Sequence, residues 1–391
     1  MTPRRIEQRV LLILDPHDGY DRRVLTGIGQ YARATSTWDF RSYCPWEMDS
    51  IHRLIDIWQP TGILSRFDKW GPELFQYIVR TGIPLVELDA RDSDIRIPRV
   101  YTDARAVVEL AAHHMMQFGI RSFGYVGGST PLDLRQIEIF AEVVGRKGFT
   151  FKSFHGEVRD ENDPSRKFNH WLKQCPLPTG LLAASDWVGW HVIAGCLNSG
   201  FRVPDDFAVM GINNDQPWSE LATVPLSSVV IAAEKIGYRA ASLLDQMMRG
   251  LTVSTDPVIL PPIGVVARMS TDIIAAEDPD IAQVLRYIHA HAAEGCTMKD
   301  VLRAVPAHRR RVEQWFGQNL GRSPFKEIQR IRIAHVKKLL AETDEPMEGI
   351  ARRCGFPTAK LLSRAFHREA GMTLLQYRNQ FTQSVRALDS A

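Results

Sequence analysis

Short apolar segments alternate with helical patterns from residue 8 to about residue 265, and this alternation limits the possible folds more than any other feature of the chain. Apolar strands separated by amphipathic helices are typical of a doubly wound parallel sheet. The predicted strands are residues 10–14, 62–65, 84–88, 122–126, 181–184, 207–212 and 228–231. The predicted helices between them include residues 22–35, 72–80, 104–118 and 188–199.

The α/β segment is long for a single sheet, and its alternation starts again after Ala104. We therefore expect two lobes. Ligands of open α/β sheets bind outside the carboxyl ends of the strands, and a two-lobed arrangement brings those ends to a cleft. The sequence predicts a small-molecule site in that cleft.

Three stretches in the second half of this segment, residues 200–215, 224–229 and 237–244, carry a family resemblance. They resemble the ligand-binding domain of lac-repressor-type regulators and periplasmic sugar-binding proteins, and the likeness covers roughly residues 8–265. In that family a carboxylate at the end of a strand accepts hydrogen bonds from sugar hydroxyls. This chain has Asn213 at that position. An amide both donates and accepts hydrogen bonds, so the resemblance implies a sugar contact from Asn213 but leaves the sugar open.

Other polar and aromatic residues also follow predicted strands and are candidates for the cleft. They are Asp21, Asp68, Arg135, Asp186 and Trp187. Carboxylates and arginine bind neighbouring hydroxyls through charge-assisted hydrogen bonds, and an indole ring can cover the apolar face of a sugar. Each has a plainer interpretation, because an aspartate after a strand is often a helix cap and a tryptophan on a helix often belongs to the core.

The character of the chain changes after residue 268. The polar, acidic residues that follow, including Pro279, predict a linker over residues 269–283, between an effector-binding domain at 1–268 and an all-α domain at 284–391. Residues 284–391 hold 19 Lys and Arg against 10 Asp and Glu, a net charge of +9, whereas the rest of the chain has a net charge of −6. A basic module beside an acidic one indicates a polyanionic partner, although a solvated basic surface is the alternative.

Two helix-turn-helix units are predicted in the basic domain. In the first, residues 308–316 form the second helix, with Val312, Trp315 and Phe316 on its buried side. Ser323 and Pro324 then begin a long helix, as N-cap and first helical residue. In the second unit, residues 347–354 form the supporting helix and residues 358–369 the reading helix.

This domain closely resembles the AraC-type family over residues 297–381. The matching positions are Phe316, Gly321, Ser323, Pro324, Arg332, Leu339, Leu340, Ile350, Ala351, Gly355, Phe356, Arg364, Phe366, Gly371, Thr373, Tyr377 and Arg378. Leu374 and Pro306 depart from the family pattern. The resemblance implies that the DNA-facing residues are Arg309, Arg310, Glu313 and Gln314 in the first unit and Ala359, Lys360, Ser363 and Arg364 in the second. Arginine at such positions reads guanine or binds phosphate, and both remain open.

No sequence feature predicts an enzyme, a cofactor or a metal site. The five cysteines are scattered without a C-x-x-C pair, which favours structural thiols in a reducing compartment. The adjacent His113 and His114 cannot face one metal from a helix. No apolar run approaches the ~20 residues that a membrane span needs, so we expect a cytoplasmic protein.

The order of the two modules, an effector domain followed by an AraC-type pair, resembles that of the xylose-operon regulators. The resemblance implies a sugar-responsive transcription activator with D-xylose or another pentose as effector, double-stranded operator DNA and RNA polymerase as partners, and a homodimer. Two alternatives remain open. The first domain binds a different effector or serves only to dimerise, or the chain is a sugar-binding protein of a transport system.

Overall fold

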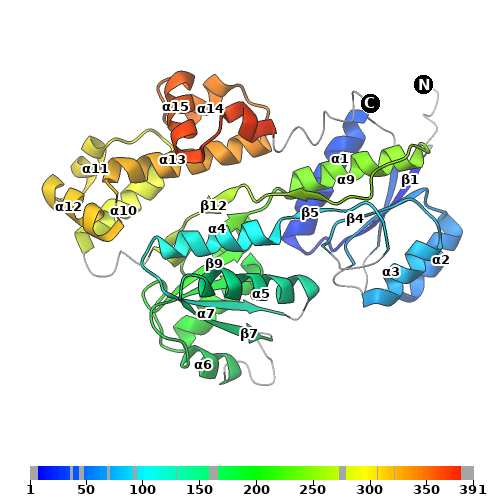
Figure 1. The fold of residues 1–391 in the computed structure, drawn as a ribbon, viewed down its shortest axis with the longest axis horizontal. Helices are drawn as coiled ribbons and strands as arrows, with labels where there is room; N and C mark the ends of the chain where they lie inside the picture. Colours follow the sequence, from blue (N-terminus) through cyan, green and yellow to red (C-terminus); the bar gives the residue numbers. More distant parts are fainter. Residues whose placement is uncertain are drawn as a thin grey trace.

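The structure is a computed structural model. It describes residues 8–35, 38–43, 48–67, 71–90, 95–128, 130–156, 158, 166–272, 279–305, 307–320 and 322–379. Figure 1 shows two α/β lobes with a helical module lying across one of them. None of the helices in these ranges is long and apolar enough to cross a membrane.

The N-terminal lobe is a four-stranded parallel sheet in the order β2-β1-β3-β4. Its central strand runs through an apolar segment in which Val10, Leu11 and Ile13 are fully buried, as expected when helices cover both faces of a parallel sheet. The strands are β1 (Gln8–Ile13), β2 (Trp38–Tyr43), β3 (Gly62–Ser65) and β4 (Leu85–Glu87), and the helices α1 (Gly19–Thr35), α2 (Met48–Trp58) and α3 (Gly71–Arg80).

The C-terminal lobe is a six-stranded sheet in the order β12-β10-β9-β8-β6-β7, in which only β12 runs antiparallel. Its strands are β6 (Ser122–Gly127), β7 (Thr150–His155), β8 (Thr179–Ala183), β9 (Phe207–Ile212), β10 (Ser227–Val230) and β12 (Gly264–Val266). Its helices are α4 (Ala104–Met116), α5 (Pro131–Gly145), α6 (Arg166–Leu172), α7 (Asp186–Asn198) and α8 (Gln216–Leu221).

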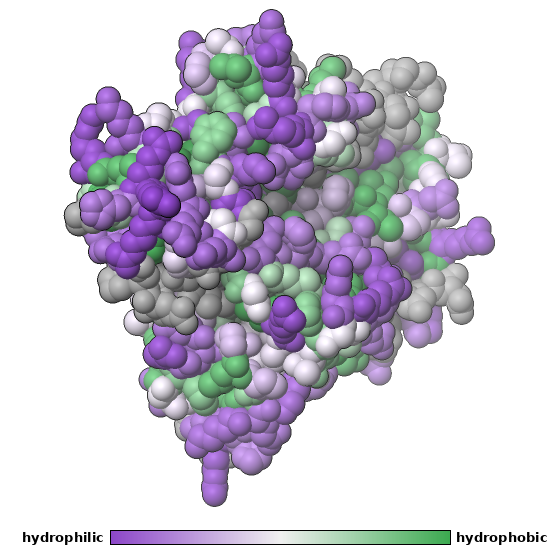
Figure 2. Space-filling model, turned by 60° about the vertical axis from the view of Figure 1, so that its left-hand side comes forward, coloured by the Kyte–Doolittle hydropathy of each residue, from purple (hydrophilic) through white to green (hydrophobic). Residues whose placement is uncertain are grey.

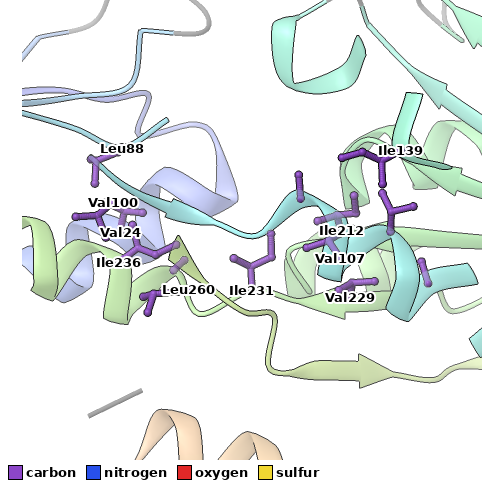
Figure 3. Close-up of a cluster of buried hydrophobic side chains, with 14 of the residues drawn as sticks. Val24, Leu88, Val100, Val107, Ile139, Ile212, Val229, Ile231, Ile236 and Leu260 are labelled. Atoms are coloured by element: carbon purple, nitrogen blue, oxygen red, sulfur yellow. The ribbon is translucent and has the colours of Figure 1, made fainter. Parts of the chain in front are cut away.

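The chain crosses between the lobes three times. The first crossover joins β5 (Val100–Thr102) to α4, the second joins β10 to α9 (Ala233–Met248), and the third joins β11 (Val258–Leu260) to β12. Strands β5 and β11 pair in parallel beside one another. One apolar cluster follows these crossovers from Leu88 in the first lobe through Ile231 to Val229 in the second, as Figure 3 shows. The crossovers are therefore packed hinge segments.

Helix α9 belongs to the first lobe, although it follows a strand of the second. It crosses α1 so closely that a Cβ atom on Gly27 would lie 1.9 Å from the carbonyl oxygen of Glu234, and one on Gly237 would lie 2.0 Å from that of Val24. Only glycine permits this backbone-to-backbone contact. Arg23 of α1 reinforces it with two hydrogen bonds of 2.7 Å to the Glu234 carboxylate.

The helical module begins at α10, and a stiff central helix joins its two halves. Helix α13 has 19 residues and is therefore about 28 Å long. It connects the first unit, α11 and α12, to the second unit, α14 and α15. A further helical turn covers residues 374–379. The helices are α10 (Pro279–His291), α11 (Met298–Ala304), α12 (Arg309–Leu320), α13 (Pro324–Glu342), α14 (Met347–Arg353) and α15 (Ala359–Ala370).

The predicted fold class is confirmed, and every predicted strand and helix overlaps an observed one. The linker differs from the prediction over residues 269–283. Its first residues form a short 3-10 helix, Met269–Thr271, in which Ser270 and Thr271 are buried in the second lobe. Ser270 donates to the carbonyl oxygen of Val209, and such hydrogen bonds make polar residues part of a core. Residues from Pro279 onward are already helical, and residues 273–278 lie outside the described part of the chain.

Candidate functional site

A cavity of about 550 Å³ lies between the two lobes, at the carboxyl ends of their parallel strands. Its wall is rich in carboxylates, with Arg66 as its one arginine among the described residues. Six aspartates contribute to it, namely Asp15, Asp18, Asp89, Asp133, Asp186 and Asp215. Carboxylate oxygens accept hydrogen bonds only, so this wall suits a neutral ligand that offers several hydroxyl donors.

Arg66 anchors the N-terminal side of the cavity. It follows β3 directly and is 8% exposed. One guanidinium nitrogen donates to Asp21 over 2.8 Å and another to Asp18 over 3.3 Å, while the group lies 5.3 Å from the centre of the Tyr20 ring. Asp21 also accepts the backbone N–H of Asp15 over 2.9 Å. These contacts hold Arg66 in one orientation toward the cavity.

Asp186 lies on the opposite side, in the first turn of α7, and is almost fully buried. Ser185 caps the helix by accepting the N–H of Val188. The Asp186 carboxylate accepts the backbone N–H of Asp215 over 2.6 Å and so ties the end of β8 to the loop after β9. Burial raises the pKa of Asp186 to about 7, although the neighbouring hydrogen bonds and Arg268 oppose the shift.

The loop after β9 is held in an uncommon backbone conformation. Asn213 and Asn214 have φ values of +100° and +54°, a region that non-glycine residues seldom occupy. Arg268 donates to the Asn214 side chain over 2.8 Å, and Arg23 donates to the Asn213 carbonyl oxygen over 2.8 Å. Strained backbone of this kind is frequent at ligand sites, where the surrounding contacts maintain it.

Two contacts join the lobes at this loop. Arg22 of α1 donates to both carboxylate oxygens of Asp215, at 3.0 and 3.2 Å. The contact between Arg23 and Asn213 is the second. Both arginines belong to the N-terminal lobe and both acceptors to the C-terminal lobe, so these contacts hold the cleft in the arrangement seen here.

Aromatic rings form one wall of the cavity. Trp187 and Trp218 line it, and Trp187 is 46% exposed. The Trp218 ring stacks on Trp190 with the ring centres 5.2 Å apart, and His191 contacts both Trp187 and Trp190. An indole beside carboxylates is a suitable surface for a sugar, which has hydroxyl edges and an apolar face.

The structure brings three of the six predicted cleft residues to the cavity wall, Asp186, Trp187 and Asn213. Asp21 lies behind the wall and is buried against Arg66. Arg135 is exposed on α5 and does not line the cavity, whereas the next residue, Gln136, does. Asp68 lies outside the described residues. The sequence prediction missed Arg66 and Asp89, although both follow strands closely.

The first helix-turn-helix unit exposes a polar helix face. Val312 and Phe316 of α12 are fully buried and Trp315 is half-buried, as the sequence pattern predicts. Arg309, Arg310, Glu313 and Gln314 are all exposed on the other side of the helix. Arg309 donates to the Glu313 carboxylate over 2.8 Å. Exposed donors and acceptors on the second helix of such a unit can reach base edges or phosphates.

The second unit is built in the same way. Thr358 caps α15 by accepting the N–H of Leu361, and Gly371 ends the helix with a φ of +70°. Leu362, Ala365 and Phe366 are buried. Of the four DNA-facing candidates, Lys360, Ser363 and Arg364 are exposed and Ala359 is half-buried.

Arg332, midway along α13, fixes one unit relative to the other. It donates to the carbonyl oxygens of Ala292 and Cys296 over 2.9 Å each, and these residues follow α10. Its guanidinium also lies 5.7 Å from the ring centre of Phe356, in the turn of the second unit. Figure 2 shows hydrophilic side chains over much of the face on which this module lies. The two reading helices are thus held on one rigid, basic body.

Within the described part of the chain, no group of three or more His, Cys, Asp or Glu side chains is placed to hold a metal ion.

Two protein-family models match the chain. Residues 112–271 match the periplasmic binding protein-like domain, and residues 301–380 match the helix-turn-helix domain. The first range covers the six strands of the C-terminal lobe together with α9 and β11, and the second covers most of the module that carries both units. The chain therefore combines a periplasmic-binding-protein-like domain with an AraC-type helix-turn-helix domain.

Relatives match the chain over nearly its whole length. A xylose operon regulatory protein of Haemophilus influenzae is 29% identical over 95% of this chain and 98% of its own length, and one of Escherichia coli K12 is 28% identical over 95% and 97%. A solved structure of a xylose-binding transcription activator is 25% identical, with a TM-score of 0.60 over 95% of this chain and 98% of that chain. These relatives are regulators, in agreement with the prediction that the chain is not an enzyme.

Proposed function

We propose that this regulator binds a neutral monosaccharide, D-xylose in the first place, in the cavity between its lobes and activates transcription in response. The observation that carries the proposal is the cavity itself. Its volume of about 550 Å³ falls in the range of roughly 300–1,000 Å³ that is usual for small-molecule sites. Full-length likeness to xylose operon regulatory proteins supports the choice of sugar.

The chemistry of the wall supports a sugar with free hydroxyls. Asp18, Asp89 and Asp215 supply acceptors from both lobes, and Arg66 and Asn213 supply donors. Trp187 and Trp218 offer aromatic surface beside them. A ligand that bridges the two sides would favour the closed cleft over an open one, because it binds both lobes only when they are close.

The predicted DNA contacts remain Arg309, Arg310, Glu313 and Gln314 in α12 and Ala359, Lys360, Ser363 and Arg364 in α15. A homodimer on paired operator sites, with RNA polymerase bound beside it, completes the proposed assembly. Because promoter DNA and RNA polymerase are in the cytoplasm of bacteria, the protein is proposed to work there.

Titration calorimetry tests the sugar. We expect heat from D-xylose and a large loss of affinity with Asp89→Ala. Binding by other pentoses and hexoses measures selectivity. Operator affinity is then measured by fluorescence anisotropy with and without the best sugar. If no sugar in the panel binds, the effector-domain part of the proposal is wrong. The alternative is then that the first domain binds a different effector or serves only to dimerise.

A further inference from the structure

The second helix-turn-helix unit packs against the hinge of the effector domain. One apolar cluster contains Val230, Ala232 and Ile263 from the crossovers together with Ile333, Val336 and Leu340 from α13. Leu362 and Phe366 of the reading helix α15 belong to the same cluster. Figure 1 shows α13 lying along β12. The reading helix therefore shares a core with the segments that connect the lobes.

A buried hydrogen bond reinforces this contact. The Tyr377 hydroxyl, in the helical turn after α15, donates to the carbonyl oxygen of Ile263 over 2.7 Å. Tyr377 is 8% exposed, and its ring packs edge-on against Phe366 with the ring centres 5.4 Å apart. A buried carbonyl that loses its partner is costly, so the contact strongly favours one position of Tyr377 on the hinge.

Ile263 is the residue at which two crossovers meet. Its own backbone N–H donates to the carbonyl oxygen of Val230 over 2.8 Å. Val230 ends β10, just before the second crossover, and Ile263 lies in the third, between β11 and β12. A rotation of one lobe about the crossovers changes the backbone dihedral angles at this point, because hinge residues absorb such rotations.

The first unit is attached elsewhere. Phe118, just after α4, packs against the core of the first unit, which contains Val284, Val312 and Phe316. Helix α4 belongs to the C-terminal lobe. One end of the helical module therefore rests on the body of a lobe and the other end on the hinge, and Arg332 resists deformation between them.

We propose that Tyr377 and its apolar surroundings are the coupling contact of this regulator, through which the position of the lobes sets the placement of the second reading helix. The coupling proposal rests on the proposed function in one respect, because a ligand in the cleft is the natural cause of lobe movement. Tyr377 is a positioning residue, because it acts on DNA through α15 and on the cleft through Ile263.

The test uses an engineered disulfide between the lobes to hold the cleft in place without any ligand. A Cβ atom built on Gly19, in the N-terminal lobe, lies 3.0 Å from the Cβ of Asp215 in the C-terminal lobe. A disulfide needs roughly 3.5–4.5 Å between these atoms, so Gly19→Cys with Asp215→Cys closes with a small adjustment. Cys44 is changed to serine in every protein. The described native cysteines, Cys175, Cys196, Cys296 and Cys354, are buried.

Operator affinity is measured after oxidation by oxidised glutathione and again after reduction by dithiothreitol. We expect the two values to differ by at least about fivefold, the lower end of usual allosteric coupling. With Tyr377→Phe added, the difference is expected to fall below about twofold. Tyr287→Phe is the matched control, since Tyr287 lies on α10 and packs against the core of the first unit, and it should leave the difference unchanged.

Three outcomes would overturn the proposal. The first is equal operator affinity in the oxidised and the reduced protein. The second is an affinity difference that Tyr377→Phe does not diminish. The third is an affinity difference that Tyr287→Phe diminishes as much as Tyr377→Phe does. Should Tyr377→Phe fail to fold, Val266→Ala replaces it, since Val266 packs on the same cluster from β12. No sugar is used, so failure of the sugar proposal leaves this result interpretable.

Discussion

Gly295 and Gly355 meet backbone to backbone between the two helix-turn-helix units. A Cβ atom on Gly355 would lie 2.4 Å from the Cα of Gly295 and 2.6 Å from its nitrogen. Both residues have positive φ values, +92° for Gly295 and +70° for Gly355. The glycine in the turn of the second unit therefore serves two purposes. It permits the left-handed turn, and it lets the loop between α10 and the first unit approach.

We predict that Gly355→Ala separates the two units and weakens operator binding. The clash is with backbone, so a side-chain rotation cannot relieve it. The change should cost about 1 kcal/mol for the positive φ and at least as much again for the displaced backbone. Thermal unfolding and operator affinity measure the two effects.

Gly371→Ala is the control for this prediction. Gly371 also has a φ of +70°, but no atom lies within 4 Å of its hypothetical Cβ. It should show the conformational cost alone and nearly normal operator binding. Equal losses of DNA affinity in the two variants would mean that close approach to Gly295 is unimportant.

Arg66→Met should destabilise the effector domain. The substitution leaves Asp21, which is 1% exposed, without its arginine partner. Removal of one partner from a buried ion pair costs about 3–5 kcal/mol, because the other charge stays buried. Arg22→Met is the matched comparison, because its pair with Asp215 is partly exposed and such pairs contribute about 1 kcal/mol or less. Urea unfolding of both variants should give clearly different losses; similar losses would contradict this assignment.

The sequence predicted the fold well where local patterns are strong. The strands of residues 62–65 and 207–212 match β3 and β9 residue for residue, because apolar runs of four and six residues bounded by polar residues are too short for a helix and favour a strand. Strand β2 was not predicted, because it lies at the edge of the sheet with only Tyr43 buried, and its sequence WDFRSY therefore has no continuous apolar run. The linker was predicted too long because the hydrogen bonds that bury Ser270 and Thr271 join residues distant in sequence.

The cleft residues were harder to predict than the reading helices. Helical spacing alone separates Val312 and Phe316 from the exposed Arg310 and Gln314. A cleft depends instead on where each strand ends, and an error of one residue changes the candidate. Gln136, not Arg135, faces the cavity, because α5 turns by about 100° per residue.

Arg310→Ala and Arg364→Ala should each weaken operator binding. Loss of a base contact costs about 1–3 kcal/mol and relaxes specificity at one position, whereas loss of a phosphate contact lowers affinity for all sequences and reduces the salt dependence. Salt titrations on specific and random DNA distinguish the two roles. Arg146→Ala, at an exposed site after α5 of the effector domain, is the control and should change neither affinity. Normal binding by both reading-helix variants would remove these residues from the interface.

Asp186→Asn should change how stability depends on pH. Burial raises the pKa of Asp186 to about 7 in the folded protein, whereas an unfolded aspartate has a pKa of about 3.9. Between these values the folded state holds the extra proton, so its stability falls as the pH rises toward 7 and beyond.

Asparagine is close in shape and can still accept the N–H of Asp215, but it does not ionise. The free energy of unfolding is measured in urea at pH 5 and at pH 8 by tryptophan fluorescence. We expect the variant to gain stability relative to wild type at pH 8. Relative to wild type, its gain between the two pH values should reach up to about 3 kcal/mol, since about two pH units separate pH 5 from the raised pKa and each unit corresponds to about 1.4 kcal/mol. An unchanged difference between the two proteins at both pH values would mean that Asp186 stays ionised in the folded cleft, held by its hydrogen bonds and by Arg268.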